Sequence, residues 1–119
     1  MADEALFLGW GEVVRGRERK AVDVFNESVQ HYAQLQQDGK LEGVEAWFLA
    51  PHGGDLAGFM LLRGERERLD EIERSAEFER LQTRAGMIVD RVGVVHAYTG
   101  EALGRLMGQF EEAAGELGG

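Results

Sequence analysis

His96 and Tyr98 are the residues whose types and spacing best suit acid–base chemistry, since they stand two apart in the apolar run RVGVVHAY. Alternate residues of a strand project from the same face, so the imidazole and the phenol would lie side by side. An imidazole takes up or releases a proton near neutral pH, and a phenol can hydrogen-bond a developing enolate. The pair is therefore the candidate catalytic group. The alternative is a structural role, in which both rings fill an apolar interface and find hydrogen-bond partners there.

Five further residues are candidates for contacting a small hydrophobic ligand. Asn26 falls at the edge of the apolar stripe of the first predicted helix. Its carboxamide would either contact a ligand between helix and sheet or hydrogen-bond a neighbouring backbone group. The other four are aromatic and would line such a pocket or belong to the core: Trp10, Tyr32, Trp47 and Phe59.

The sequence has no pattern typical of a metal or cofactor site. The absence of cysteine removes thiolate metal sites and cysteine nucleophiles. The three histidines are far apart, and none belongs to an HxH, HxxE or HExxH pattern. The charge-rich stretch GERERLDEIERSAEFER is typical of a solvated, ion-paired helix face. The segment GEALGRLMG lacks the lysine and hydroxyl residue of a phosphate-binding loop. We therefore expect neither a metal nor another cofactor.

The elements that must position these residues follow the order strand, helix, strand, strand, helix, strand, helix. Hydrophobic periodicity predicts strands at 5–14, 44–50, 56–63 and 91–99, and helices at 17–38, 65–90 and 101–117. Gly39 suits the C-terminal cap of the first helix, and PHGGD suits a hairpin loop. With right-handed crossovers, this order predicts one α+β domain over 1–119, with a four-stranded antiparallel sheet of the ferredoxin-like type plus a C-terminal helix.

The second predicted helix contains a mismatch. Leu69 and Ile72 define one apolar stripe, whereas Phe78 and Leu81 belong to another that is rotated by about 150° on a helical wheel. A straight helix cannot point both stripes inward. We therefore expect a break near Ser75.

The four strand-like runs are apolar on both sides: EALFLGW, GVEAWFLA, LAGFMLL and RVGVVHAY. A sheet that is apolar on both faces needs a cover on both, and the helices of so short a chain cover one. The second face therefore predicts a homodimer or a bound ligand. Alternate residues of a strand lie on the same face, so Gly9 shares a face with Phe7 on the first strand and Gly93 shares a face with Val95 on the fourth. We expect this glycine-bearing face under the helices and the larger aromatic face between subunits.

The net charge of −9 indicates which partners to exclude. Such a surface repels phosphate backbones and anionic membrane surfaces, so we expect no nucleic-acid and no membrane partner. No stretch approaches about 18 uninterrupted apolar residues, and the N-terminus lacks a basic leader. The expected location is cytoplasmic.

The element order, with GRERKAVDVFNE, AWFLAPHGGDLAGFMLLRG, SAEFERLQTRAGMIVD and VGVVHAYTG, resembles the dimeric α+β barrel superfamily, which includes antibiotic-biosynthesis-type monooxygenases and NIPSNAP-type proteins. The resemblance implies that the sheets of two chains close a barrel. It also implies a small-molecule-binding protein, or a cofactor-independent monooxygenase-like enzyme, that acts on a hydrophobic and possibly aromatic compound. The alternative is a non-catalytic dimeric barrel that serves as an interaction or accessory module. The superfamily also includes haem-degrading monooxygenases, which resemble one another in an asparagine on the first strand. The first strand of this chain, ALFLGWGEVV, has no asparagine.

Overall fold

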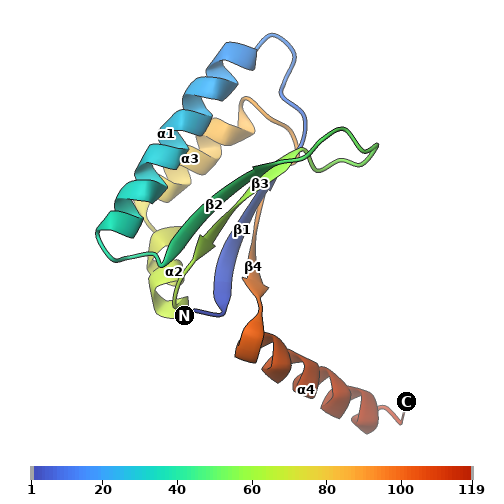
Figure 1. The fold of residues 1–119 in the computed structure, drawn as a ribbon. Coiled ribbons are helices and arrows are strands. Elements are labelled where there is room, and N and C mark those ends of the chain that lie inside the picture. The colour runs from blue at the N-terminus through green and yellow to red at the C-terminus, as the bar shows by residue number, and fades with distance from the viewer. Residues whose placement is uncertain (1, 119) are drawn as a thin grey trace.

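The computed structural model describes residues 2–118, and within them four strands form one antiparallel sheet in the order β2–β3–β1–β4 (Figure 1). The strands are β1 (Glu4–Trp10), β2 (Gly43–Phe48), β3 (Gly58–Arg63) and β4 (Gly93–Tyr98). The helices are α1 (Glu18–Gln37), α2 (Arg66–Glu73), α3 (Ala76–Gly86) and α4 (Gly100–Glu116). The predicted ferredoxin-like α+β fold is confirmed. The first strand is shorter than predicted, because the chain leaves the sheet after Trp10 and continues only as a bridge from Val13 to Val89.

The core lies between the sheet and α1, α2 and α3, which cover one face of it (Figure 1). Cross-strand partners project to the same face, and Leu6 of β1 is paired with both Leu62 of β3 and His96 of β4. Leu6 and Leu62 are fully buried against Leu69 and Leu81 of the helical layer. Leu6 and Leu8 of β1 and Met60 and Leu62 of β3 therefore point toward the helices.

The predicted assignment of the glycine-bearing face is wrong. Gly9 is paired with Gly93 and with Phe59, and this set faces away from the helices. A Cβ atom at Gly9 would lie 2.8 Å from the ring of Phe7, so the missing side chain makes room for that ring rather than for a helix. The error arose because parity groups residues within a strand but does not say which group faces the helices.

The face of the sheet opposite the helices carries an uncovered apolar patch. The rings of Phe7 and Phe59 stack with centroids 5.0 Å apart, and Trp47 stacks on Phe59 at 6.3 Å. Val95, the cross-strand partner of Phe7, is 57% exposed. This surface, which we call the open sheet face, runs across all four strands. A contiguous apolar patch of this kind is typical of an interaction surface.

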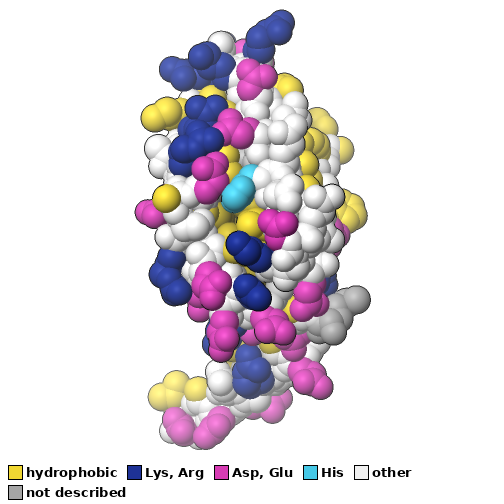
Figure 2. All heavy atoms as spheres, turned by 90° about the vertical axis from the view of Figure 1, so that its left-hand side faces the viewer, with side chains coloured by type: hydrophobic (Ala, Val, Ile, Leu, Met, Phe, Trp, Pro, Cys, Tyr) yellow, Lys and Arg dark blue, Asp and Glu magenta, His cyan; other side chains and the backbone are white. Residues whose placement is uncertain are grey.

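The outer side of the helical layer differs from the open sheet face, because charged side chains of both signs are distributed across it (Figure 2). Glu27 of α1 accepts hydrogen bonds from Arg80 and Arg84 of α3. The hydrogen bond from Arg80 is the main reason why the pKa of Glu27 is below its ordinary value. Arg80 also pairs with Glu77 one turn earlier on the same helix. The predicted ion-paired helix face is thus confirmed for α3.

The end of α1 matches its predicted glycine cap. Gly39 has a φ of 77°, and its N–H donates to the carbonyl of Gln36. The N–H of Lys40 donates to the carbonyl of Leu35. This pair of bonds satisfies the last carbonyls of the helix while glycine takes the left-handed conformation at no steric cost.

The predicted break near Ser75 is also confirmed. α2 ends at Glu73, and Ser75 is the N-cap of α3 with an extended ψ of 148°. The Ser75 hydroxyl accepts a hydrogen bond from the N–H of Phe78 at 3.2 Å. The new helix axis brings Phe78 into the same core as Leu69. Two short helices thereby bury both apolar stripes.

Ser75→Ala is expected to lower the free energy of unfolding by about 1 kcal/mol, the usual effect of losing an N-cap side chain. Urea denaturation followed by circular dichroism measures it. The matched control is Thr83→Ala, because the Thr83 hydroxyl is exposed and bonds only the carbonyl of Glu79 within its own helix. Equal losses in the two variants would contradict a capping role for Ser75.

α4 leaves the end of β4 and projects from the rest of the molecule (Figure 1). The radius of gyration is 16.5 Å, against about 13.5 Å expected for a compact chain of this length. The predicted apolar side of α4 is largely exposed, with Met107 at 51% and Phe110 at 69%. Within residues 2–118, no helix combines the length and apolarity needed to cross a membrane.

Candidate functional site

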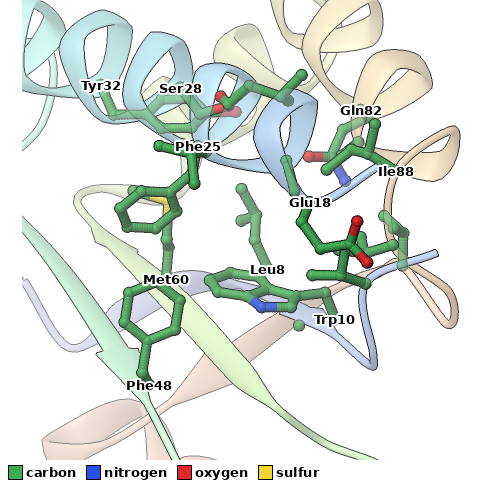
Figure 3. Close-up of a pocket in the computed structure, with 18 residues that line it drawn as sticks. Leu8, Trp10, Glu18, Phe25, Ser28, Tyr32, Phe48, Met60, Gln82 and Ile88 are labelled. Carbon is green, nitrogen blue, oxygen red and sulfur yellow. The ribbon is translucent and has the colours of Figure 1, made fainter. Parts of the chain in front are cut away.

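A cavity of about 500 Å³ lies between the sheet and the helices α1 and α3 (Figure 3). Leu8 and Met60 form its floor on the sheet, and Phe25 of α1 lies over them. Ile88, just after α3, closes one side. The lining is almost entirely apolar, so this space favours a ligand with a large hydrophobic surface.

Three aromatic rings meet at one side of the cavity. The ring centroid of Trp10 lies 6.1 Å from that of Phe25 and 6.0 Å from that of Phe48. The rings of Phe25 and Phe48 are 5.0 Å apart. Phe48 is 67% exposed and therefore lies at the mouth, whereas Trp10 is deeper. Such a set of rings offers faces and edges on which a flat ring can pack.

The hydroxyl of Tyr32 is the most unusual polar group of the cavity wall. Tyr32 is 1% exposed, and among residues 2–118 its hydroxyl has no hydrogen-bond partner. Burial, together with the nearby charge of Glu77, raises the pKa of the phenol above its ordinary value, so it stays protonated at neutral pH. A buried donor without a partner is unfavourable unless a ligand or water supplies an acceptor. The donor would be satisfied if a polar group of a ligand in the cavity reached it.

The cavity contains two of the residues predicted to contact a ligand, Trp10 and Tyr32. Asn26 is exposed on the outer side of α1, because it follows Phe25 by one residue and is turned by about 100° from it. Trp47 and Phe59 belong to the open sheet face, on the opposite side of the sheet from the cavity. Asn26, Trp47 and Phe59 therefore lie outside the lining of this cavity.

His96 and Tyr98 share a face of β4, as predicted, but they lie beneath α2 and outside the cavity lining. The imidazole Nε2 is 3.1 Å from Glu73 Oε1. The Tyr98 ring lies with its centroid 6.0 Å from the guanidinium carbon of Arg66. The structure therefore separates the predicted acid–base pair from this cavity.

Sequence reasoning missed several lining residues. Phe48 was not singled out because the predicted strand carries two adjacent aromatic residues, and only their register shows that Trp47 faces away from the cavity. Gln82 and Glu18 bring further polar atoms to the wall. Phe25 could have been found from the sequence, because it stands seven residues before Tyr32 and therefore lies on the same apolar side of α1.

No protein-family model matches the chain, and neither does any curated protein. Among solved structures, it is similar to a crystal structure described as a dimeric protein of unknown function and ferredoxin-like fold from Bacteroides fragilis. The TM-score is 0.58 at 7% sequence identity, over 81% of this chain and 96% of that one. A likeness at this level of identity concerns the fold alone. It supports the ferredoxin-like architecture read from the sheet order.

Proposed function

We propose that the protein binds a small, mainly apolar compound with a ring system in the cavity between α1, α3 and the sheet. The main support for this proposal is the cavity itself. Its volume of about 500 Å³ falls in the range of small-molecule sites, about 300–1,000 Å³. Trp10, Phe25 and Phe48 would pack on the ring system. The buried Tyr32 hydroxyl would donate to one polar substituent, which would fix the orientation of the ligand.

Cofactor-independent oxygenation of such a compound is the catalytic form of this proposal, and it rests on the resemblance to antibiotic-biosynthesis-type monooxygenases. The position of His96 and Tyr98 outside the cavity favours binding without turnover. Oxygen consumption with a compound known to bind would distinguish the two forms.

We also propose that a second copy of the chain covers the open sheet face. The stacked rings of Phe7, Phe59 and Trp47 supply an apolar surface that a matching sheet would bury. The exposed apolar side of α4 supplies a second contact. The similar structure from Bacteroides fragilis is itself described as dimeric. Two sheets packed in this way would close a barrel and leave the cavity of each subunit accessible on the outer side.

The two tryptophans provide a direct test of ligand binding, because Trp10 lines the cavity and Trp47 lies across the sheet from it. 4-Bromophenol is a suitable probe, since it is an apolar ring with one polar group and its bromine quenches indole fluorescence on contact. In Trp47→Phe, which keeps Trp10, we expect saturable quenching. In Trp10→Phe, which keeps Trp47, we expect only the linear quenching of random collisions. Saturable quenching in Trp10→Phe alone would contradict the cavity as the site.

Tyr32→Phe tests the polar contact separately. It is expected to weaken 4-bromophenol binding about tenfold, as the loss of one hydrogen bond of about 1.4 kcal/mol would, while leaving bromobenzene binding unchanged. Equal effects on both probes would show that Tyr32 contributes shape rather than a hydrogen bond.

A further inference from the structure

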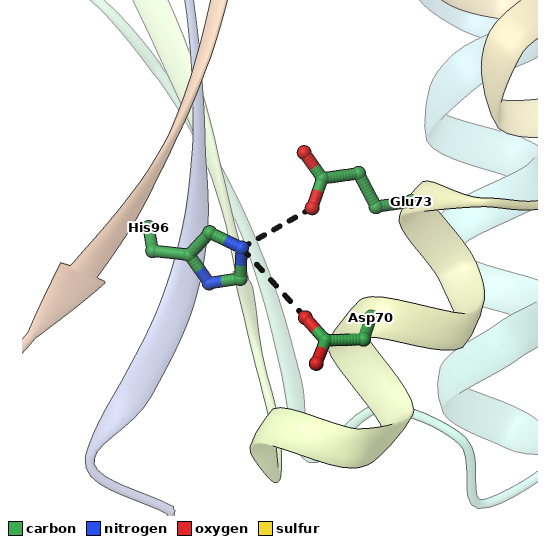
Figure 4. Close-up of side chains that lie close together, drawn as sticks. All are labelled: Asp70, Glu73 and His96. Carbon is green, nitrogen blue, oxygen red and sulfur yellow. Dashed lines mark hydrogen bonds and ion pairs between the residues drawn. The ribbon is translucent and has the colours of Figure 1, made fainter.

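Three potential metal-ligating groups converge at one place outside the cavity. Asp70 and Glu73 stand three residues apart on α2, so both carboxylates project from the same side of that helix. His96 of β4 faces them, and both carboxylates lie toward the same imidazole nitrogen, Nε2 (Figure 4). Its distances are 3.1 Å to Glu73 Oε1 and 3.8 Å to Asp70 Oδ1.

The spacing of these atoms approaches that of a coordination sphere. One nitrogen or oxygen from each residue lies within 4.8 Å of the others. Ligand atoms around a tetrahedral Zn²⁺ ion, at bond lengths of about 2.0–2.1 Å, stand about 3.3 Å apart. Side-chain torsions of Asp70 and Glu73 can supply the remaining movement, because both side chains are 38% exposed and, within residues 2–118, pair only with His96.

The charges around these three residues favour the binding of a cation between them. Two carboxylates face a single imidazole, so the acidic groups of the cluster outnumber its one basic group. Glu73 is the last residue of α2, where the negative end of the helix dipole adds to that charge. Glu73 also borders an open groove formed with Phe78, Gln82 and Val94. Water or an external ligand can therefore reach a bound ion.

We propose that Asp70, Glu73 and His96 form a binding site for a divalent transition-metal ion of the Zn²⁺ type. One imidazole nitrogen and two carboxylate oxygens are ligands that such ions accept, whereas Mg²⁺ and Ca²⁺ prefer oxygen alone. Three protein ligands leave at least one coordination position open toward the groove, which is typical of catalytic rather than structural sites. The site joins α2 to β4 and is independent of the proposed ligand cavity.

Isothermal titration calorimetry of the full chain without an affinity tag tests the site, with ZnCl₂ as the titrant. We expect one Zn²⁺ per chain and no comparable heat from MgCl₂. His96→Asn and Glu73→Gln should each weaken Zn²⁺ binding by at least about tenfold, since even the loss of an outer-shell partner has an effect of that size. Thermal melting of the same samples should show stabilisation of the original protein by Zn²⁺ and none for the two variants.

Two control variants separate the site from adventitious binding. His31→Asn removes another histidine, on α1, and Glu71→Gln removes an exposed carboxylate from α2 itself. Both should bind Zn²⁺ like the original protein. The proposal is overturned if the original protein binds no Zn²⁺, or if His96→Asn and Glu73→Gln bind it as well as the controls. Melting without metal establishes that each variant is folded, so a loss of binding cannot be mistaken for unfolding.

Discussion

Val95→Glu is expected to convert a dimeric protein into a monomer. In the single chain Val95 is 57% exposed, so a charge at this position has little effect on the isolated subunit. In the proposed dimer the same side chain is buried among the apolar groups of the open sheet face, where an unpaired charge costs on the order of several kcal/mol. Light scattering should show a particle of twice the chain mass for the original protein and of one chain mass for the variant.

Met87→Glu is the matched control for this experiment. Met87 is 59% exposed, which is close to the exposure of Val95, but it lies at the end of α3 on the helical side. The control should remain dimeric. A monomeric original protein at micromolar concentration, or an unchanged mass for Val95→Glu, would show that the open sheet face is not the contact between subunits.

Leu62→Ala is expected to produce the largest loss of stability, about 2–5 kcal/mol in the free energy of unfolding. The Leu62 side chain is fully buried between the sheet and the helical layer, in contact with the core that includes Leu6 and Leu69. Truncation removes apolar contacts and leaves a void in the core. Urea denaturation at two protein concentrations measures the change.

The neighbouring residue gives the comparison. Leu61 is one position earlier on β3 and faces the open sheet face, where it is paired with Phe7. Leu61→Ala should therefore have an effect that depends on protein concentration, since its apolar contacts form mainly on association. Leu62→Ala should lower stability by a similar amount at both concentrations. If Leu62→Ala costs less than about 1 kcal/mol, the packing described for the core is incorrect.

The features predictable from sequence are those decided by neighbouring residues. The break at Ser75 follows from the mismatch between the stripes of Ile72 and Phe78, and the end of α1 follows from Gly39. Both depend on a few consecutive positions, so the local pattern contains all the information needed. The orientation of the sheet faces depends instead on which residues of β1 pair with β3 and β4, and that register is a property of the whole fold.

The candidate sites show the same division. Tyr32 and Trp10 were predictable because each belongs to an apolar pattern that also forms the cavity wall. The partners of His96 were not, since Asp70 and Glu73 read as part of a solvated charged helix and lie more than twenty positions earlier in the chain. Only the packing of α2 against the sheet brings them to the imidazole.

The glycines of α4 have a consequence for how the chain acquires its shape. A Cβ atom at Gly104 or Gly108 would meet no atom within 4 Å, so nothing in the described part of the chain requires glycine there. Each glycine in a helix interior costs about 1 kcal/mol relative to alanine, and a helix that projects alone is marginal in water. We therefore expect α4 to be largely uncoiled in a separated subunit and to become helical as the subunits associate. Folding of the C-terminal segment and assembly would then be one coupled process, visible as a gain of helical circular dichroism with increasing protein concentration.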